Sequence, residues 1–491
     1  MPVLRTPDFG VLLIAAAELV VLLAAASGYG YHRDELYFLA AGRHLAPAYP
    51  DQGPLVPLLA HAMNAIAPGS LTVLRVPSAL AAGGIVMLSG LLAGELGGSR
   101  RAQRLAAAVT AVAVIVLFTG HTLSTSTFDL LIWTVVSWLV VRAVRTGADR
   151  LWMLIGAVLG VGLLNKPLPA FLAAALLAGS LISGPRRLAL NRYMWFGAAL
   201  AAILWSPWLV WQALHGWPQL AVARSIAAGG STSSAPWWQI VPFQALLAGP
   251  VLAPVWIAGL VRLFRDPALR RWRFLGWAWA LLAVVFMAVG GKPYYLAGLL
   301  PLLIAAGAVP VEGWLSGGRR RVRAAALAGA LLVSAVAGAL IALPLLPSRD
   351  VAPVVAMNPD VGETIGWPDL VASVARVRHR LPADAPVVVL TANYGEAGAI
   401  DRYGPAVGLP HAYSGHNAYG LWGPPPAGAG PVIAVGLPVA GLAEHLRDCA
   451  PAGRIDNAAG IDNDERGAPI VICAGPRGSW AAEWPALRHL G

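Results

Sequence analysis

The sequence predicts a polytopic α-helical membrane protein that ends in a small extracytoplasmic α/β domain. Hydrophobic residues make up 57% of the 491-residue chain and charged residues only 12%, against about 25% charged in soluble proteins. Long apolar runs recur over residues 1–345, whereas they shorten to strand length from residue 346 onward. The formal net charge of +11 comes from arginine clusters between the apolar runs. This is the pattern of cytoplasmic loops, not of a nucleic-acid-binding surface.

The apolar runs of residues 1–345 are long enough for about eleven transmembrane helices. We expect their centres near residues 19, 84, 111, 136, 157, 176, 203, 251, 282, 304 and 333. Basic clusters lie at 100–104, 142–150, 186–192, 262–273 and 319–323. The positive-inside rule places these clusters and the N-terminus in the cytoplasm, and residues 30–70, 214–240 and the tail outside. The first run has no evident cleavage site, so we expect a retained anchor in the cytoplasmic (inner) membrane.

The tail, residues 346–491, alternates short apolar runs with helical patterns, which predicts an α/β domain. The expected strands are 387–390, 431–435 and 470–472, and the expected helices are 369–381 and 438–448. Cys449 and Cys473 are the only cysteines of the chain. Their location in an exported domain favours a disulfide, and two buried thiols are the alternative.

The first outer loop opens with the charged tetrad His32-Arg33-Asp34-Glu35, directly after the first apolar run. Adjacent carboxylates at a membrane surface are costly to desolvate and add nothing to core packing. They therefore indicate a membrane enzyme rather than a channel. We expect two short interfacial helices in this loop, with Asp34 near the start of the first, where the helix dipole favours an acid. The alternative is that Asp34 only caps this helix. Asp51 is a further acid, in a turn-like segment.

Other polar side chains gather at the predicted outer ends of spans. Asp129 lies at the top of the fourth span among hydroxyl groups. Lys166 and Lys292, the only lysines of the chain, each precede a proline between two spans. Fixed cations in such positions suit a lipid phosphate. The alternative is that each lysine only extends toward the lipid headgroups.

Two isolated residues have less specific signals. Glu18 lies in the middle of the first span and is expected to face the interior of the helix bundle. His215 follows the seventh span, where a lone histidine is usually an ordinary surface residue. If it met Asp51 or Asp34, it could complete a site for a divalent cation, although nothing in the spacing shows this.

Aromatic and polar side chains cluster over about thirty residues of the tail. They are Tyr394, Tyr403, His411, Tyr413, His416, Tyr419 and Trp422. Such a group could line a carbohydrate-binding face, or it could pack the tail onto the membrane part. The sequence leaves both possibilities open.

Four segments resemble family 39 glycosyltransferases, which include protein O-mannosyltransferases and the lipid A aminoarabinose transferase. The segments are Tyr31–Phe38, Asp51–Leu55, Gly162–Lys166 and Lys292–Tyr295. The resemblance covers about residues 1–345 and implies the C-type glycosyltransferase fold, with residues 30–70 as the outer catalytic loop. Residues 387–477 are similar to the outer domain of bacterial members, within the separate α/β domain expected over 346–491.

The resemblance implies an inverting transfer of a sugar from a polyprenyl monophosphate to a hydroxyl acceptor on a protein, lipid or polysaccharide. Asp34 would be the general base, Glu35 would orient the acceptor or support the loop, and Asp51 would be the second acid. The aminoarabinose transferases carry Glu-Lys-Pro-Pro where this chain has Asp51-Gln52-Gly53-Pro54. The lysine of that motif is absent here. The donor phosphate would therefore contact Lys166, Lys292, Arg33, Tyr294 and Tyr295.

The chemistry of such a transfer agrees with these residue types. An inverting transfer needs one base, and its phosphate leaving group needs positive charge rather than a general acid. In an alternative arrangement, Asp34, Asp51 and His215 hold a divalent cation. A transporter or lipid flippase would place charges near the bilayer midplane, and a non-catalytic scaffold would need no base. Because the polar residues gather at the outer ends of spans, the sequence favours a transferase.

Overall fold

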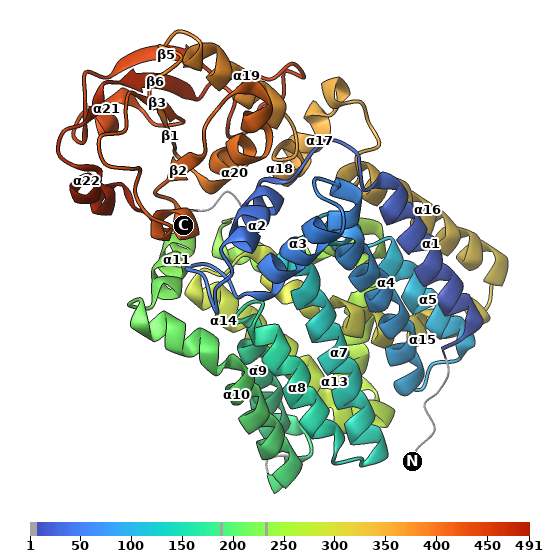
Figure 1. Cartoon of the computed structure of the whole chain (residues 1–491). Helices are drawn as coiled ribbons and strands as arrows, with labels where there is room; N and C mark the ends of the chain where they lie inside the picture. Colours follow the sequence, from blue (N-terminus) through green and yellow to red (C-terminus); the bar gives the residue numbers. More distant parts are fainter. Residues whose placement is uncertain (1–6, 187–189, 231–233) are drawn as a thin grey trace. The chain divides into compact units, whose positions relative to one another are not determined.

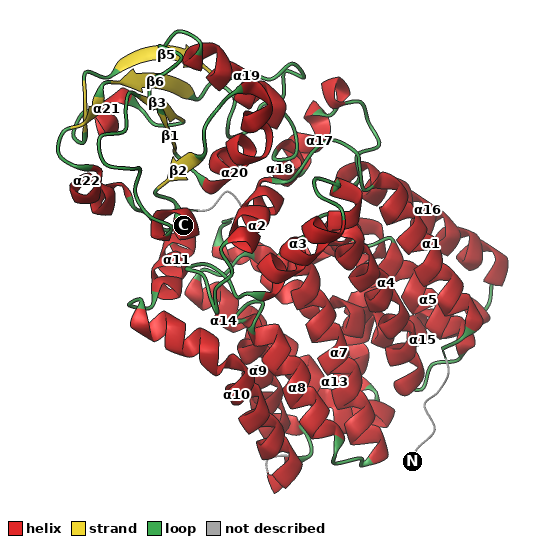
Figure 2. Cartoon of the chain, in the orientation of Figure 1, coloured by secondary structure: helices red, strands yellow, loops and turns green. Residues whose placement is uncertain are grey.

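The computed structural model describes residues 7–186, 190–230 and 234–491. Their contacts define two compact units (Figure 1). A helical unit contains Met1–Ala26, Arg75–Gly216 and Ala223–Leu343, and a mixed unit contains Ser27–Leu74, Trp217–Val222 and Pro344–Gly491. The described strands all belong to the mixed unit (Figure 2). The mixed unit therefore combines the first outer segment with the tail.

The helical unit is built from apolar helices around a core that includes Trp133, Phe274 and Phe286. Its helices are α1 (Phe9–Ala25), α4 (Leu71–Glu95), α5 (Arg100–Ala111), α6 (Val114–His121), α7 (Thr125–Thr146), α8 (Leu151–Leu163), α9 (Leu168–Ser183), α10 (Arg192–Leu214), α12 (Phe243–Ala248), α13 (Ala253–Arg265), α14 (Arg273–Val289), α15 (Leu300–Ser316) and α16 (Arg320–Ala342). The first residues of α4 belong to the mixed unit. The helix α11 (Pro218–Ala227) crosses from the mixed unit into the helical unit.

Glu18 is only 5% exposed, in agreement with the expected orientation toward the bundle interior.

The predicted multi-pass membrane protein is confirmed, but the number of spans is not. Ten of the eleven predicted centres fall within an α-helix, and the centre near residue 251 falls in the 3-10 turn Pro250–Leu252 between α12 and α13. Among the described residues, six helices are long and apolar enough to span a membrane, or up to eight if two bent helix pairs each count as one span. The helices α1, α8 and α9 are apolar but have 17, 13 and 16 residues, fewer than the roughly 20 of a typical span.

Two of the long helices show directly that the helical unit has a lipid-facing surface. Only 17% of the apolar window of α10 and 11% of that of α16 are buried. Exposing so much apolar surface to water would be unfavourable. The outer faces of α10 and α16 are therefore suited to contact lipid.

The first outer segment forms two short helices, α2 (Arg33–Arg43) and α3 (Leu55–Ile66), as the sequence predicts. A capping box starts α2: the His32 side chain accepts from the backbone, and the Glu35 carboxylate accepts from the His32 backbone N–H at 2.8 Å. His32, and not Asp34, is thus the N-cap. The alternative in which Asp34 only caps this helix is not what the structure shows.

The tail contains a five-stranded mixed sheet of order β2-β1-β3-β6-β5. Its strands are β1 (Val388–Thr391), β2 (Ala412–Ser414), β3 (Val432–Val435), β5 (Ala450–Arg454) and β6 (Pro469–Cys473). The strand β1 is parallel to β2 and β3, and β6 is antiparallel to β3 and β5. The four buried residues of β1 and of β3 explain why these strands are continuous apolar runs in the sequence.

The remaining helices of the tail are short, and one differs from the prediction. They include α17 (Ala352–Met357), α18 (Pro359–Gly362), α19 (Trp367–Arg378), α20 (Tyr394–Tyr403), α21 (Val439–Leu442) and α22 (Trp480–Leu487). The prediction of a helix over 438–448 is wrong beyond α21, because β4 (Leu446–Arg447) pairs with β7 (Gly475–Pro476). Tertiary strand pairing overrides the local pattern there. A disulfide joins Cys449 to Cys473.

Within the mixed unit, α20 of the tail lies along α2 of the first outer segment in the same direction. Tyr394, Gly398 and Asp401 of α20 contact Asp34, Leu36 and Arg43 of α2, respectively. The helices approach so closely that a Cβ atom at Gly398 would lie 2.8 Å from the Leu36 Cβ and 3.0 Å from its carbonyl carbon. Only glycine fits this position without a shift of backbone atoms.

We therefore expect Gly398→Ala to destabilise the mixed unit by about 1–3 kcal/mol, the usual cost of overpacking. The matched control is Gly441→Ala in α21, where a Cβ atom would meet nothing within 4 Å. Limited proteolysis of the purified full chain in increasing urea measures the urea concentration at which each variant unfolds. The close α2–α20 contact would be contradicted if the two variants unfolded at the same urea concentration as the wild type.

Candidate active site

Asp34 is an accessible carboxylate at the start of α2. Its side chain is 38% exposed. The Tyr394 hydroxyl of α20 donates to Asp34 Oδ1 at 2.8 Å. Burial, and then the charge of Asp34, hold the pKa of Tyr394 well above its usual range. The tyrosine therefore stays protonated, and its hydroxyl fixes the Asp34 carboxylate by donating a hydrogen bond to it.

Asp51 is more enclosed than Asp34. Its Oδ1 accepts from the Tyr37 hydroxyl at 2.8 Å, and its Oδ2 accepts from Asn417 Nδ2 at 3.2 Å. Burial raises the pKa of Asp51 to about 6; the Tyr37 hydrogen bond opposes this rise and the charge of Asp34 adds to it. The rings of Tyr37 and Tyr394 stack with centroids 4.5 Å apart. One aromatic pair thus holds both acids.

Arg33 belongs to the same cluster of charges. Its Nη1 lies 3.2 Å from Asp464 Oδ2 and 3.6 Å from Glu363 Oε2, and its Nε lies 4.0 Å from Asp34 Oδ1. Burial raises the pKa of Glu363 to about 8, although Arg33 opposes the shift. Because its guanidinium is paired with acids of the mixed unit, Arg33 acts here as a support of the cluster. Its contact with a donor phosphate stays a prediction.

Glu35 has a structural environment. Its side chain is fully buried and bonded to the backbone of His32 in the capping box. Of the two roles expected from the sequence, support of the loop is the one compatible with this burial. Contact with an acceptor would require the start of α2 to open.

A second cluster, in the helical unit, brings together both lysines of the chain. The Nζ atoms of Lys166 and Lys292 lie 5.6 Å and 6.0 Å from the centroid of the Tyr294 ring. Lys166 Nζ also donates to Ser126 Oγ at 3.3 Å. The two ammonium groups place positive charge beside this ring, and such charge favours a nearby anion.

Buried polar and aromatic side chains surround this lysine pair. Asn165 is buried, and its Nδ2 donates to the Thr125 carbonyl at 2.7 Å, which fixes the turn before Lys166. Tyr295 packs edge-on against Tyr294 at 5.1 Å. Asp129 is 7% exposed and close enough to Lys166 for their charges to interact. Asp129, Lys166, Lys292 and the two tyrosines thus lie near one another in the helical unit, and their contact with a donor phosphate stays a prediction.

His215 has local contacts at the end of α10. It is exposed, its Nδ1 lies 2.8 Å from the Trp211 carbonyl oxygen, and its ring stacks on Trp211 at 4.0 Å. Within the described ranges, no three His, Cys, Asp or Glu side chains gather as a metal site. A cation held by Asp34, Asp51 and His215 stays a prediction.

Tail residues that sequence reasoning did not assign to the site complete the acid cluster. In the sequence, Tyr394 is only one of several tail aromatics, and Asn417 has no signal that points to a site. Other tail aromatics also pack on the first outer segment: Trp422 stacks on His44 at 4.3 Å, and Tyr403 meets Tyr31 edge-on at 6.4 Å. For Tyr394, Tyr403 and Trp422, the packing role is the one observed.

Comparison with protein families supports the resemblance seen in the sequence. Residues 51–211 match the family model described as dolichyl-phosphate-mannose-protein mannosyltransferase. No curated protein matches the chain significantly.

Solved structures share the fold. The structure of ArnT from Cupriavidus metallidurans bound to undecaprenyl phosphate superposes with a TM-score of 0.61 at 16% identity, covering 95% of this chain and 99% of that chain. Its apo form gives a TM-score of 0.58 at the same identity and coverage. The Archaeoglobus fulgidus oligosaccharyltransferase tethered to an acceptor peptide gives 0.52 at 13% identity, covering 82% of this chain and 63% of that chain.

These structures show the fold of this protein. It has a C-type glycosyltransferase fold with a small C-terminal sheet domain. The expected resemblance to family 39 glycosyltransferases is thereby confirmed.

The raised pKa of Asp51 predicts a pH-dependent stability. The protonated side chain is favoured in the folded state, with a pKa of about 6, above the value of about 3.9 expected when unfolded. The contribution of protonated Asp51 to the free energy of unfolding is therefore fully present below pH about 4. It is lost as the pH rises through about 6. Because the side chain of Asp51→Asn cannot ionise, we expect the stability of this variant not to fall over the same pH range.

Urea denaturation between pH 4 and pH 7, monitored by limited proteolysis, would compare the stability of Asp51→Asn with that of the wild type. Asp384→Asn, at an exposed carboxylate of the same unit, is the control. Parallel pH curves for the wild type and Asp51→Asn would show that Asp51 is not held in the way described.

Proposed function

We propose that the protein transfers a sugar from a polyprenyl-monophosphate donor to a hydroxyl acceptor on the outer face of the cytoplasmic membrane, with inversion at the anomeric carbon. The observation that carries this proposal is the convergence of Lys166 and Lys292 on the Tyr294 ring. Positive charge in this position suits a lipid-linked phosphate.

The lysine pair would bind the donor phosphate and stabilise it as the leaving group. During transfer, the bond between the anomeric carbon and the phosphate oxygen breaks, and negative charge grows on the phosphate. The two ammonium groups offer positive charge in advance of this step. Because the released polyprenyl phosphate is a stable anion, no general acid is required at the leaving oxygen.

Asp34 would act as the general base. It removes the proton from the acceptor hydroxyl while that oxygen attacks the anomeric carbon from the face opposite the phosphate. Its exposed side chain suits this role better than Asp51, whose two oxygens both accept hydrogen bonds within the mixed unit. Tyr394 holds Asp34 in one orientation, and Asp51 holds Tyr37, whose ring stacks on Tyr394.

Structures of similar fold support the choice of donor. The ArnT structure contains undecaprenyl phosphate, and the archaeal oligosaccharyltransferase is tethered to an acceptor peptide. For this chain, we propose a polyprenyl-phosphate sugar as donor and a protein, lipid or polysaccharide hydroxyl as acceptor. A panel of donors that carry different sugars tests which sugar is transferred.

We expect Asp34→Asn to lower the transfer rate by about 100-fold or more, since general-base catalysis contributes about 10²–10⁴. Purified protein would be given a panel of radiolabelled undecaprenyl-phosphate sugars with a membrane extract as acceptor. Donor binding should be retained in the variant. The matched control is Asp464→Asn, which removes an exposed carboxylate 3.2 Å from Arg33 and should transfer at nearly the wild-type rate.

The same assay separates the alternatives. If no donor is consumed by the wild type, or if Asp34→Asn transfers normally, the transferase proposal fails and a lipid or solute transporter becomes the better explanation. Treatment with a chelator addresses the arrangement in which Asp34, Asp51 and His215 hold a divalent cation. Our proposal predicts unchanged transfer after chelation, whereas the cation arrangement predicts its loss.

We expect Lys166→Gln and Lys292→Gln each to raise the KM for the donor about tenfold, because each removes a charge-assisted contact with the phosphate. Replacement by arginine should restore part of the affinity, since the charge is kept. Arg265→Gln, at an exposed cation of the same unit, is the control. Unchanged donor KM in both lysine variants would rule out the lysine pair as the phosphate site.

A further inference from the structure

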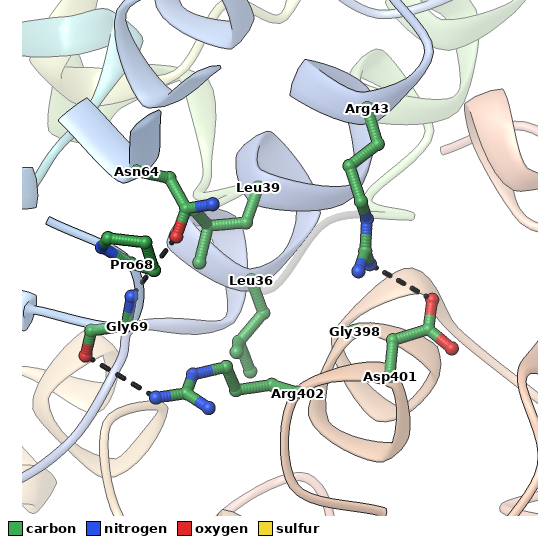
Figure 3. Close-up of a pocket in the computed structure, with 9 residues that line it drawn as sticks. All are labelled: Leu36, Leu39, Arg43, Asn64, Pro68, Gly69, Gly398, Asp401 and Arg402. Carbon is green, nitrogen blue, oxygen red and sulfur yellow. Dashed lines mark hydrogen bonds and ion pairs between the residues drawn. The ribbon is translucent and has the colours of Figure 1, made fainter. Parts of the chain in front are cut away.

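A separate polar pocket lies within the mixed unit, between α2, α3 and α20. Its volume is about 310 Å³. Figure 3 shows the residues that line it: Leu36, Leu39, Arg43, Asn64, Pro68, Gly69, Gly398, Asp401 and Arg402. The lining contains two arginines and one carboxylate, so it carries net positive charge.

The carboxylate of Asp401 is fully engaged by the protein itself. Its side chain is 3% exposed. Its Oδ1 accepts from the Ala412 N–H at 3.0 Å and lies 2.8 Å from His411 Nδ1. Its Oδ2 accepts from the Tyr419 hydroxyl at 3.1 Å and from Arg43 Nη2 at 3.3 Å. Asp401 therefore anchors Arg43 and offers little acceptor capacity to a ligand.

The donors of the pocket are only partly used. Arg402 Nη2 donates to the Gly69 carbonyl at 3.3 Å, and its Nε donates to the Tyr31 hydroxyl at 3.5 Å. Asn64 Oδ1 accepts from the Gly69 N–H at 3.2 Å. These bonds leave the Asn64 amide group, the second Arg402 amino group and the remaining Arg43 donors for a ligand (Figure 3). The available groups are thus donors.

We propose that this pocket binds an oxyanion, a phosphate or carboxylate group carried by a soluble sugar or by a lipid headgroup. Guanidinium groups match the planar or tetrahedral arrangement of such oxygens. The apolar floor formed by Leu36 and Leu39 would contact the rest of the ligand. This inference does not depend on the proposed transfer reaction.

The pocket is distinct from the Asp34 site. Leu36, Leu39 and Arg43 of α2 line the pocket at helical spacing, whereas Asp34 is not among its lining residues and contacts Tyr394, one turn earlier on α20. On α20, the stripe Tyr394, Gly398 and Arg402 runs from the acid cluster to the pocket. One helix thus orients Asp34 at its start and closes the pocket near its end.

Binding is tested on the purified full chain in neutral detergent by microscale thermophoresis. The probes are inorganic phosphate, glucuronate and dihexanoyl phosphatidic acid, with dihexanoyl phosphatidylcholine as the zwitterionic reference. We expect at least one anionic probe to bind, and Arg43→Gln to weaken that binding about tenfold through the loss of a charge-assisted hydrogen bond. Binding of phosphate or glucuronate assigns a soluble ligand, and binding of phosphatidic acid alone assigns a lipid headgroup.

Two further variants keep the test independent of folding. Arg402→Gln should also weaken binding, but it removes contacts with Tyr31 and Gly69. Asn64→Asp keeps the side-chain size and should weaken binding by placing a negative charge in the pocket. Arg454→Gln, at an exposed arginine elsewhere in the same unit, should bind like the wild type. The proposal is overturned if no anionic probe binds, or if Arg43→Gln and Asn64→Asp bind as tightly as the wild type.

Discussion

The geometry of the acid cluster depends on the hydrogen bond from the Tyr394 hydroxyl to Asp34, which the close packing of α20 against α2 makes possible. The first outer segment holds only two short helices, and a segment of that size cannot bury enough apolar surface to stay folded alone. The tail supplies the missing surface through the glycine contact at Gly398 and the stacked rings of Tyr37 and Tyr394. These contacts hold the first outer segment against the tail, and the Tyr394 hydrogen bond fixes the direction of the Asp34 carboxylate.

The charges of the molecule are arranged in two different ways. In the acid cluster, donors and Arg33 hold the carboxylates, so the cluster is stable without a ligand. At Tyr294, two ammonium groups approach one ring, and their positive charge suits the binding of an anion. The first arrangement suits a base that must keep its orientation, and the second suits a site that must bind a phosphate and then release it.

The sequence predicts much of the fold and part of the candidate site, because the signals for these features are local. Apolar run length locates the membrane helices, arginine clusters suggest their orientation, and the rarity of lysine draws attention to Lys166 and Lys292. The capping box could have been read from His32 and Glu35, although histidine is an unusual N-cap. The contacts of Tyr394 and Asn417 with Asp34 and Asp51 could not be predicted, because they join residues more than 350 positions apart and leave no periodic pattern. The number of spans also escaped prediction, since helix length and bends depend on tertiary packing.

The central claim is that the lysine pair is the phosphate site of a lipid-linked sugar donor. A cryo-electron microscopy structure of the purified protein in lipid nanodiscs with undecaprenyl phosphate tests it most directly. We predict density for the phosphate within hydrogen-bonding distance of the Nζ atoms of both Lys166 and Lys292, beside the Tyr294 ring. A phosphate bound away from both lysines would contradict the account.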